Sequence, residues 1–316
     1  MTLRFVATRL AALLVTVALS SLAIHGALFL APGDPATLLV GGSRSPDPAV
    51  LAGIRAEYHL DDPFLKSYWH WLSGCLHGDF GRSLVYRDTV AHLIGDRAGH
   101  TLALVVYAAV LVLALGTFTG TLAALRGGRV ETLVTAVTAG AMAVPTFVMS
   151  ALLIWVFAVR LPWFPVYGSG TGFTGTLSHL TLPAVALALT WIGYVAQVTR
   201  TAVRAELRSE HVETARGRGV PESVVIRRHV LHNAAGPVFA VSGVGIAGLI
   251  ATAAVAEQAF GTGGLGAFMI DAAAKQDMAA VQAVSLVFVV AFVVINTLVD
   301  LVGAALDPRA ARKGTP

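Results

Sequence analysis

The sequence predicts an all-α integral membrane protein with six transmembrane helices and a long extracytoplasmic segment after the first of them. Of its 316 residues, 56% are hydrophobic and only 13% are charged, whereas about 25% of the residues in an ordinary soluble domain are charged. A soluble core cannot take up that much apolar surface, so the excess must face lipid. A helix needs about 20 apolar residues to span the hydrocarbon core. Six runs have about this length: Ala7–Leu30, Thr101–Leu125, Leu133–Val159, Leu180–Thr199, Pro237–Ala256 and Val281–Val299.

These runs divide the chain into four parts. We expect a transmembrane helix over residues 1–30, an extracytoplasmic segment over 31–100, a five-helix core over 101–308 that includes a cytoplasmic loop over 200–236, and a cytoplasmic tail over 309–316. The first run follows Arg4 and Arg9, as the apolar core of a cleaved signal peptide would. It exceeds the 7–15 residues of such a core, which favours a retained helix.

Charged residues predict the orientation, because cytoplasmic loops are enriched in Lys and Arg. The loop over 200–236 contains seven arginines, whereas the two short loops on the other side contain only Arg160 and Lys275. Both termini are therefore expected in the cytoplasm. Glu257 and Asp300 fall at span ends, where we expect them to reach polar surroundings, and no Asp, Glu, Lys or Arg lies inside a span. Proton-coupled carriers usually need such buried groups, so this pattern disfavours an ion-coupled secondary carrier.

The segment over 31–100 is too polar to span the membrane. Pro32–Pro35 predicts a turn that leaves the bilayer, and Pro46 and Pro48 predict that the irregular stretch continues. Leu84–Arg97 has the pattern of an amphipathic helix that leads into the second span. Four aromatic residues predict either a small outer core or a helix at headgroup level, with docking of a partner as the alternative. They are Phe64, Tyr68, Trp69 and Trp71.

Several classes of site are disfavoured by the sequence. Cys75 is the only cysteine, so the chain cannot form an internal disulfide or a CxxC site. Gly261–Gly266 fits GxGxxG, but it follows a span rather than a strand, which argues against a dinucleotide site. The chain contains no GxxxxGK[ST] and no paired catalytic groups within the spans, and its net charge of +4 is too dispersed for nucleic acid. Isolated histidines could form part of a nickel path, although local hydrogen bonds are their commoner role: His25, His100 and His179.

Several predicted spans contain glycine or proline, which can interrupt a helix. Gly116, Gly120, Pro145 and Pro183 lie within predicted spans. Bundled membrane helices tolerate both residue types, because neighbouring groups can satisfy the backbone atoms that they free. We therefore expect each run to remain a single helix.

The loop over 200–236 has a helix–stop–helix pattern. Ser209–Arg218 can form a short helix, Gly219 is suited to cap its C-terminus, and Pro221 prevents its continuation. Pro221 also suits the first turn of a second helix that runs to Asn233. The two helices would form a compact cytoplasmic protrusion. By composition alone, the same segment also suits a solvated basic connector.

The pattern within this loop resembles a known motif. Glu213-Thr214-Ala215, followed after three residues by Gly219, resembles the EAA motif of permease subunits of ATP-binding-cassette (ABC) importers, with Thr214 in place of the usual Ala. Over about 300 residues the chain resembles the dipeptide/oligopeptide/nickel family of these permeases. The segments that carry the resemblance are Leu30–Pro35, Tyr58–Pro63, His77–Ser83, Arg227–Ala234, Gly263–Gly266 and Asp300–Arg309. The later part of the general motif is matched only loosely, by His229–His232.

The resemblance implies a fold of the importer-permease type and a place in a larger assembly. The chain would form half of the translocation pathway for short peptides that an external binding protein delivers. Its partners would be a second homologous permease, two ABC ATPase subunits and the lipid bilayer, with ATP and Mg bound by the ATPases and no cofactor in this chain. The location would be the bacterial cytoplasmic (inner) membrane. Nickel or another small solute is the alternative cargo within the same family.

The resemblance also assigns candidate site residues. In this family the loop forms a coupling helix that rests in a groove on an ATPase subunit. The matching residues here are Glu210, Val212, Glu213, Thr214, Ala215, Arg216 and Gly219. We expect Val212 and Ala215 to present a small apolar face to the groove, and a nearby Arg to hold Glu213. The glycine-rich run Ser242–Gly248 is a candidate face for close packing with a partner helix.

Overall fold

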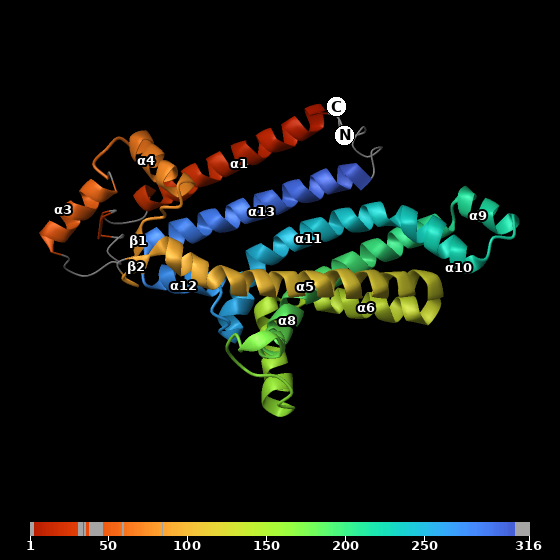
Figure 1. The fold of residues 1–316 in the computed structure, drawn as a ribbon. Coiled ribbons are helices and arrows are strands. Elements are labelled where there is room, and N and C mark those ends of the chain that lie inside the picture. Colours follow the sequence, from red (N-terminus) through yellow and green to blue (C-terminus); the bar gives the residue numbers. More distant parts are fainter. Residues whose placement is uncertain are drawn as a thin grey trace.

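The protein folds as an elongated bundle of helices with a two-stranded hairpin (Figure 1). The computed structural model describes residues 3–30, 34, 36–37, 47–58, 60–83 and 85–306. The expected tail over 309–316 and most of the turn at Pro32–Pro35 lie outside these residues. Within the described residues, five helices are long and apolar enough to cross a membrane, and there are up to six spans if a bent pair of helices counts as one span. The predicted all-helical class is confirmed.

The five long helices are α1 (Leu3–Leu30), α5 (Val90–Arg126), α8 (Gly172–Leu207), α11 (Leu231–Phe260) and α13 (Met278–Leu306). The shorter helices are α3 (Pro48–Glu57), α4 (Phe64–Leu76), α6 (Gly128–Ala143), α7 (Thr146–Leu153), α9 (Glu210–Gly217), α10 (Glu222–Val224) and α12 (Leu265–Ala274). Two π-helical segments extend α7 and α10, namely η1 (Ile154–Arg160) and η2 (Val225–Val230). Strands β1 (Arg82–Ser83) and β2 (Asp88–Thr89) pair antiparallel.

The third predicted span, Leu133–Val159, is wrong as a single helix. It lies in α6 and in α7 with η1, and these two parts are bent by 105° relative to each other. The break falls at Val144, which is extended with φ −88° and ψ 121°, and at Pro145. Pro145 has no N–H to donate, and its ring disfavours helical geometry at the residue before it. Pro183, by contrast, lies inside the unbroken helix α8.

Other predicted boundaries also differ from those in the structure. The predicted amphipathic helix Leu84–Arg97 is instead the β-hairpin followed by the first turns of α5, with Thr89 as the N-cap. The predicted helix from Pro221 to Asn233 and the fifth span form one continuous helix, Glu222–Phe260. Two helices were not predicted. Pro48 begins α3 rather than prolonging an irregular stretch, because Asp47 caps the helix and proline suits its first turn, and α12 follows the glycine turn.

The core of the bundle is the crossing of α5 and α8, where two glycines allow the backbones to approach closely. A Cβ placed on Gly116 would lie 2.8 Å from the Cβ of Val195, and one placed on Gly120 would lie 2.7 Å from the Cβ of Thr199. The carbonyl oxygen of Ala196 would be closer still to a side chain at residue 120. Small residues at such crossings are typical of helices that associate in lipid.

The glycine-rich run Ser242–Gly248 also packs within the chain. A Cβ on Gly245 would lie 3.0 Å from the indole of Trp191 on α8, and Gly248 faces the same ring. Gly243 faces the side chain of Val299 on α13. These glycines join α11 to α8 and α13, so the expectation that this run receives a partner helix is wrong.

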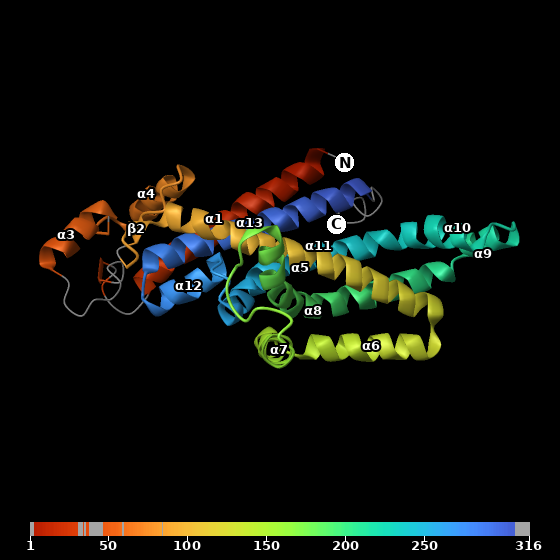
Figure 2. The same cartoon turned by 60° about the horizontal axis from the view of Figure 1, so that its bottom comes forward.

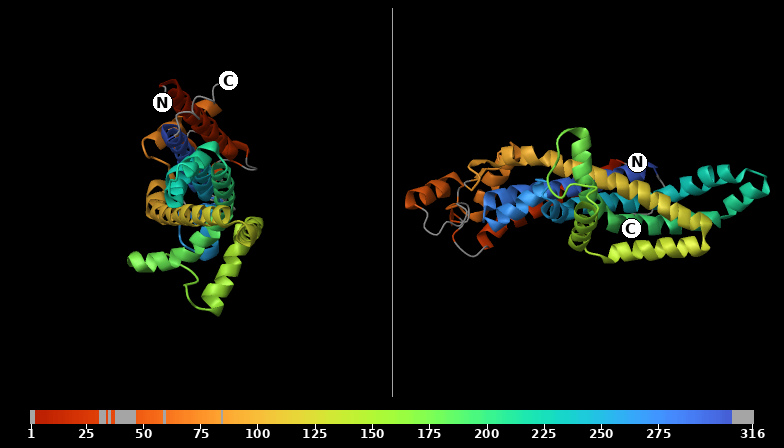
Figure 3. Two further views of the ribbon diagram at one scale, coloured as in Figure 1. Left: turned by 90° about the vertical axis from the view of Figure 1, so that its right-hand side faces the viewer. Right: turned by 90° about the horizontal axis from the view of Figure 1, so that it is seen from below.

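The two ends of the bundle differ. Figures 1, 2 and 3 show α3, α4 and α12 at one end and α9 with α10 at the other. Helices α1 and α13 lie side by side, and an ion pair of 2.9 Å joins Arg9 Nη1 to Asp300 Oδ2. Asp300 therefore reaches a polar partner, as expected for the end of a span.

A buried carboxylate joins α5, α11 and α12. Glu257 was expected to reach polar surroundings at the end of a span. It is instead fully buried, and its polar partners are groups of the protein. Its carboxylate accepts hydrogen bonds from Thr101 Oγ1 at 2.6 Å, from the Gly266 amide at 2.7 Å and from the Ala267 amide at 3.1 Å. The Leu265 amide donates to Thr101 Oγ1 at 2.8 Å. The carboxylate thus satisfies first-turn amides of α12, which have no partner within that helix.

The segment between the first two spans makes polar contacts at Asp271 and Asp277. Tyr86 Oη and Lys275 Nζ donate to Asp271 at 2.6 and 2.7 Å, and Ser83 Oγ donates to Asp277. The hydrogen bonds from Lys275 and Tyr86 hold the pKa of Asp271 below its usual value. A lowered pKa in the folded state means that this contribution to stability is present at neutral pH and is lost as the pH falls through the titration of the carboxyl group.

The outer aromatic cluster is partly confirmed as a small core. Phe64, Tyr68 and Trp71 of α4 surround the imidazole of His25 on α1, with ring centroids 5.3–5.8 Å from it. Tyr68 Oη also lies 2.7 Å from Ser21 Oγ. Trp69 does not join this core and is 64% exposed.

The close approach at Gly120 predicts a matched pair of variants. Gly120→Ala should destabilise the protein by about 1–3 kcal/mol, because the added methyl group meets backbone that cannot move aside. Gly140→Ala makes the same chemical change in α6, where a Cβ meets open space, and should be neutral or stabilising. Thermal unfolding in one detergent measures both variants. Equal melting temperatures would contradict the assigned packing.

The carboxylate of Glu257 predicts a second graded pair. Glu257→Ala leaves Thr101 and the amides of Gly266 and Ala267 without their partner, at a cost of about 1–3 kcal/mol for each group that is fully buried. Glu257→Gln keeps one acceptor oxygen and should lose less. The measurement is the unfolding temperature in lipid nanodiscs. A Glu257→Ala protein as stable as the wild type would show that these hydrogen bonds do not hold α12.

Candidate functional site

The candidate site is the protrusion that α9 forms at one end of the bundle (Figure 1). Helix α8 ends at Leu207, and Arg208 and Ser209 turn the chain into α9. The carbonyl of Ser209 accepts from the amides of Val212 at 3.0 Å and Glu213 at 3.1 Å. The predicted helix Ser209–Arg218 is confirmed to within its capping residues. Glu210 and Glu213 lie in its first turn, where negative charge complements the helix dipole.

The C-terminus of α9 has a Schellman motif. Gly219 adopts φ +77°, its amide donates to the Arg216 carbonyl at 2.9 Å, and the Val220 amide donates to the Ala215 carbonyl at 3.2 Å. These are the two hydrogen bonds that define the motif, and Val220 packs in the same apolar cluster as Ala215. The predicted cap at Gly219 is confirmed. A Cβ at this position would meet open space, so the requirement for glycine comes from the backbone conformation alone.

The apolar face of α9 points inward. Val212 and Ala215 are buried in a cluster with Val203 of α8 and with Val225 and Val230 of the segment that leads into α11. The expectation that Val212 and Ala215 face outward is therefore wrong, because these apolar side chains fix α9 to its own chain. The outward face is polar and contains the exposed residues Glu210, Glu213, Thr214 and Arg216.

The charges around α9 are also arranged differently from the expectation. Arg216 donates to Glu222 at 3.0 and 2.5 Å, so it pairs across the turn rather than with Glu213. Among the described residues no ion pair of Glu213 is found. The exposed carboxylate of Glu213 therefore remains available to a partner.

A polar contact also holds α9 to both of its neighbours. His211 Nε2 lies 3.3 Å from Glu206 Oε2 at the end of α8 and 3.1 Å from Asn233 Nδ2 on α11. Sequence reasoning did not identify these residues, since Asn233 lies 22 positions from His211 and no short-range pattern links them. With the apolar cluster, the contact fixes α9 on two sides.

The base of the protrusion is joined to α6. Arg200 and Arg204 of α8 donate to the same oxygen of Glu131, Arg200 at 3.0 Å. Arg208 follows on the same side of α8, and these arginines line a shallow surface cavity. Any displacement of α9 and α8 would therefore also act on α6.

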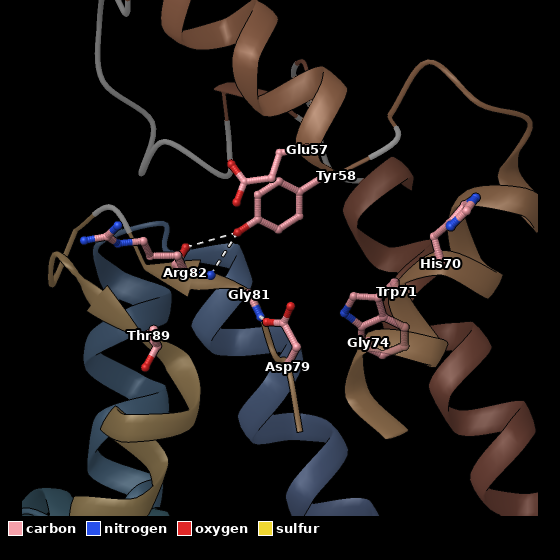
Figure 4. A pocket seen from close by; sticks show the side chains of 9 residues that line it. All are labelled: Glu57, Tyr58, His70, Trp71, Gly74, Asp79, Gly81, Arg82 and Thr89. Carbon is pink, nitrogen blue, oxygen red and sulfur yellow. Dashed lines mark hydrogen bonds between the residues drawn. The ribbon is translucent and has the colours of Figure 1, made fainter. Parts of the chain in front are cut away.

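A second candidate lies at the opposite end of the molecule. A pocket of about 280 Å³ is lined there by the rings of Tyr58 and Trp71 and by the carboxylates of Glu57 and Asp79. Figure 4 shows how these side chains lie. Tyr58 Oη donates to the Arg82 carbonyl at 3.3 Å and accepts from the Arg82 amide at 3.0 Å. The pocket thus lies where the segments Tyr58–Pro63 and His77–Ser83 meet. Carboxylates and aromatic faces attract cationic groups.

The three histidines singled out from the sequence and the GxGxxG segment line neither the pocket nor α9. His25 Nε2 lies 3.4 Å from Ser67 Oγ, and His179 Nδ1 lies 2.8 Å from the carbonyl of Gly175 in its own helix. Within the described part of the chain, no group of three or more His, Cys, Asp or Glu side chains is placed to hold a metal ion. Gly261 is left-handed and caps α11, so the GxGxxG segment forms a turn between two helices.

The chain matches two family descriptions that together cover most of its length. Residues 113–312 match the binding-protein-dependent transport system inner membrane component, and residues 2–105 match the N-terminal part of the binding-protein-dependent transport system membrane component. Since the first match alone covers more than half of the chain, it shows the family.

Curated relatives match nearly the whole chain. The probable peptide ABC transporter permease protein y4tP of Sinorhizobium fredii is 32% identical over 309 residues, which are 96% of this chain and 98% of that protein. The glutathione transport system permease protein GsiC of Shigella boydii is 33% identical over 307 residues, which are 97% of this chain and 98% of that protein. The GsiC protein of Escherichia coli K12 is 32% identical over the same length.

Solved structures share the fold of the core. Two inward-facing structures of the MetNI methionine ABC transporter each match 71% of this chain and 97% of their own chain, with TM-scores of 0.51 and 0.54 at 18% and 19% identity. The resemblance stated from the sequence is confirmed by these comparisons. The chain belongs to the binding-protein-dependent transport system inner membrane components, as a multi-pass permease subunit of an ABC transporter.

Proposed function

We propose that the chain forms half of the translocation pathway of an ATP-driven importer for short peptides, with α9 as the helix that couples it to an ATPase subunit. The observation that carries the coupling role is the construction of α9. It projects from the bundle, has a polar outward face, and is fixed by its buried face and its C-terminal cap. A helix held in this way moves as one body with the helices on which it packs.

The route for such a movement follows from the contacts. A displacement of α9 acts on α8 and α11 through Val212 and Ala215 and through the polar contacts of His211. Helix α8 contacts α5 through Gly116 and Gly120, and α6 through Arg200 and Glu131. Closure of the ATPase subunits would thus tilt the main spans together.

The proposed partners follow from the family and from what the sequence lacks. Without a phosphate-binding loop, the chain depends on two ABC ATPase subunits that bind ATP and Mg. A second homologous permease would supply the other half of the pathway, and an external binding protein would deliver the cargo. Peptides are the favoured cargo, because the names of the relatives specify peptides and glutathione. The separate positions of His25 and His179 give a nickel path no support.

The proposed topology places both termini in the cytoplasm with α9, and α3 and α4 outside. The start of α1 and the end of α13 lie together at the Arg9–Asp300 ion pair, toward the end of the bundle that carries α9 (Figure 1). The arginine-rich loop over 200–236 belongs on the cytoplasmic side by the positive-inside rule.

Two substitutions at Gly219 test the coupling role. Gly219→Val should strongly reduce ATP-dependent peptide uptake, because a β-branched residue disfavours φ +77° by about 1–2 kcal/mol and the cap of α9 would rearrange. Gly219→Asn should keep more activity, since Asn tolerates the left-handed region. Uptake is measured in vesicles that contain the complete transporter, alongside protein abundance and co-purification of the ATPases.

The controls use the same helix. Gly217→Ala lies in helical backbone where a Cβ meets open space and should transport as the wild type does. Glu213→Ala should weaken ATPase docking more mildly than Gly219→Val, because it removes one exposed charge and leaves the helix intact. If the Gly219→Val transporter showed normal uptake at normal abundance, the coupling role would be wrong, and the loop would be only a solvated basic connector.

The topology predicts opposite labelling of two exposed positions. In a Cys75→Ala background, a cysteine replacing His77 should react with a membrane-impermeant maleimide in intact cells, and one replacing Thr214 only after permeabilisation. Burial raises the pKa of the native Cys75 thiol to about 11, so this thiol reacts slowly with maleimide. The Cys75→Ala background removes the remaining reaction. Labelling of both positions from one side would overturn the topology.

A further inference from the structure

Helix α4 has three distinct faces. At 3.6 residues per turn, Leu65, Trp69, Leu72 and Leu76 fall within an arc of about 60° around the helix axis. Leu65, Trp69 and Leu76 are 70%, 64% and 75% exposed, and Leu72 is half-buried. We call these four residues the α4 stripe. Nothing in the described chain covers its three exposed members.

The other two faces of α4 are accounted for. Ser67, Tyr68 and Trp71 point toward α1, where Ser67 and Tyr68 contact His25 and Ser21. A polar face lies between the packed face and the stripe, and it includes Lys66, His70, Ser73 and His77. Lys66 forms an ion pair with Asp62 at 3.1 Å. A helix with one protein face, one polar face and one apolar face is suited to lie at a boundary between water and lipid.

The contacts with α1 place α4 at such a boundary. The candidate span of α1 runs from Arg4 to Ala27, and α4 contacts it at Ser21 and His25. At a rise of 1.5 Å per residue, these contacts lie about 3–9 Å inside the outer end of the span. Interfacial helices bury their apolar face about 5–10 Å into the boundary between headgroups and acyl chains. The depth of α4 therefore matches that of a helix seated in the bilayer surface.

We propose that α4 is an interfacial helix whose stripe of Leu65, Trp69, Leu72 and Leu76 is immersed in the phospholipid bilayer. Trp69 lies in the middle of the stripe, and tryptophan is enriched at headgroup level. The assignment to the outer leaflet rests on the proposed topology, whereas the immersion itself rests on the exposed stripe and on the contacts with α1. Because Trp71 and Gly74 of α4 line the pocket in Figure 4, lipid contact at α4 also sets the height of that pocket above the membrane.

A spin-label scan of the assembled transporter in lipid nanodiscs tests this proposal. In the Cys75→Ala background, single labels replace Leu65, Trp69 and Leu76 of the stripe, and Lys66, Ser73 and His77 of the polar face serve as matched controls. Each label is tested for collision with oxygen, which concentrates in lipid, and with a water-soluble nickel chelate. We expect the ratio of oxygen to nickel collisions to be severalfold higher at the stripe than at the polar face.

Three results would overturn the proposal. Equal ratios on both faces would place the stripe in water. Low collision with both reagents at the stripe would mean that the second permease covers it. Loss of collision with both reagents only when purified binding protein is added would assign the stripe to that partner.

The leaflet is tested separately from the immersion. A membrane-impermeant maleimide should label the polar-face cysteines from the outside of intact cells. Labelling from the cytoplasmic side only would overturn the outer-leaflet assignment together with the proposed topology, even if the collision pattern shows that the stripe lies in lipid.

Discussion

The structure depends on how closely α5 and α8 approach each other. In lipid, apolar side chains gain nothing by leaving their surroundings for another helix, so helices associate through close van der Waals contact. Gly116 and Gly120 allow that contact against Val195, Ala196 and Thr199. The position of α8 in turn sets the position of Trp191, against which α11 packs through Gly245 and Gly248. The spans are therefore ordered around one crossing.

The position of the protrusion depends on the same helices, because α9 packs on α8 and on the segment that leads into α11. Helix α9 has no apolar surface to spare for a partner, since Val212 and Ala215 are used to hold it on α8 and on the segment that leads into α11. In the proposed coupling role, recognition of an ATPase subunit would then fall to the polar outward face, and the buried face would transmit movement. Under that proposal, a short helix with a glycine cap would be sufficient as a mechanical connection between subunits.

Sequence reasoning was most successful where a local rule decides the structure. The capping geometry of Gly219 follows from residues within one turn, and the Schellman hydrogen bonds confirm it. The long apolar runs likewise predict spans, because the thickness of the bilayer is fixed. The limit at Pro145 is instructive, since Pro183 has the same chemistry but remains inside a helix. Which proline breaks a helix depends on neighbours that the sequence does not reveal.

The residues that could not be predicted are those whose roles depend on distant partners. The direction of Val212 and Ala215 depends on Val203, Val225 and Val230, and the pairing of Arg216 depends on Glu222. His211 and Asn233 meet only because α9 folds back beside α11. In each case the role of the residue depends on which side chains surround it in the folded chain, and the sequence does not give that information.

The carboxylate of Glu257 has a consequence for biogenesis. Thr101 precedes Glu257 by 156 positions, so a ribosome that feeds this chain into the membrane delivers the hydroxyl group long before the carboxylate that binds it. Helix α12 emerges later still, and its first amides need the same carboxylate. Until then, the hydroxyl group of Thr101 has to use another acceptor, such as a carbonyl group of the preceding turn of its own helix.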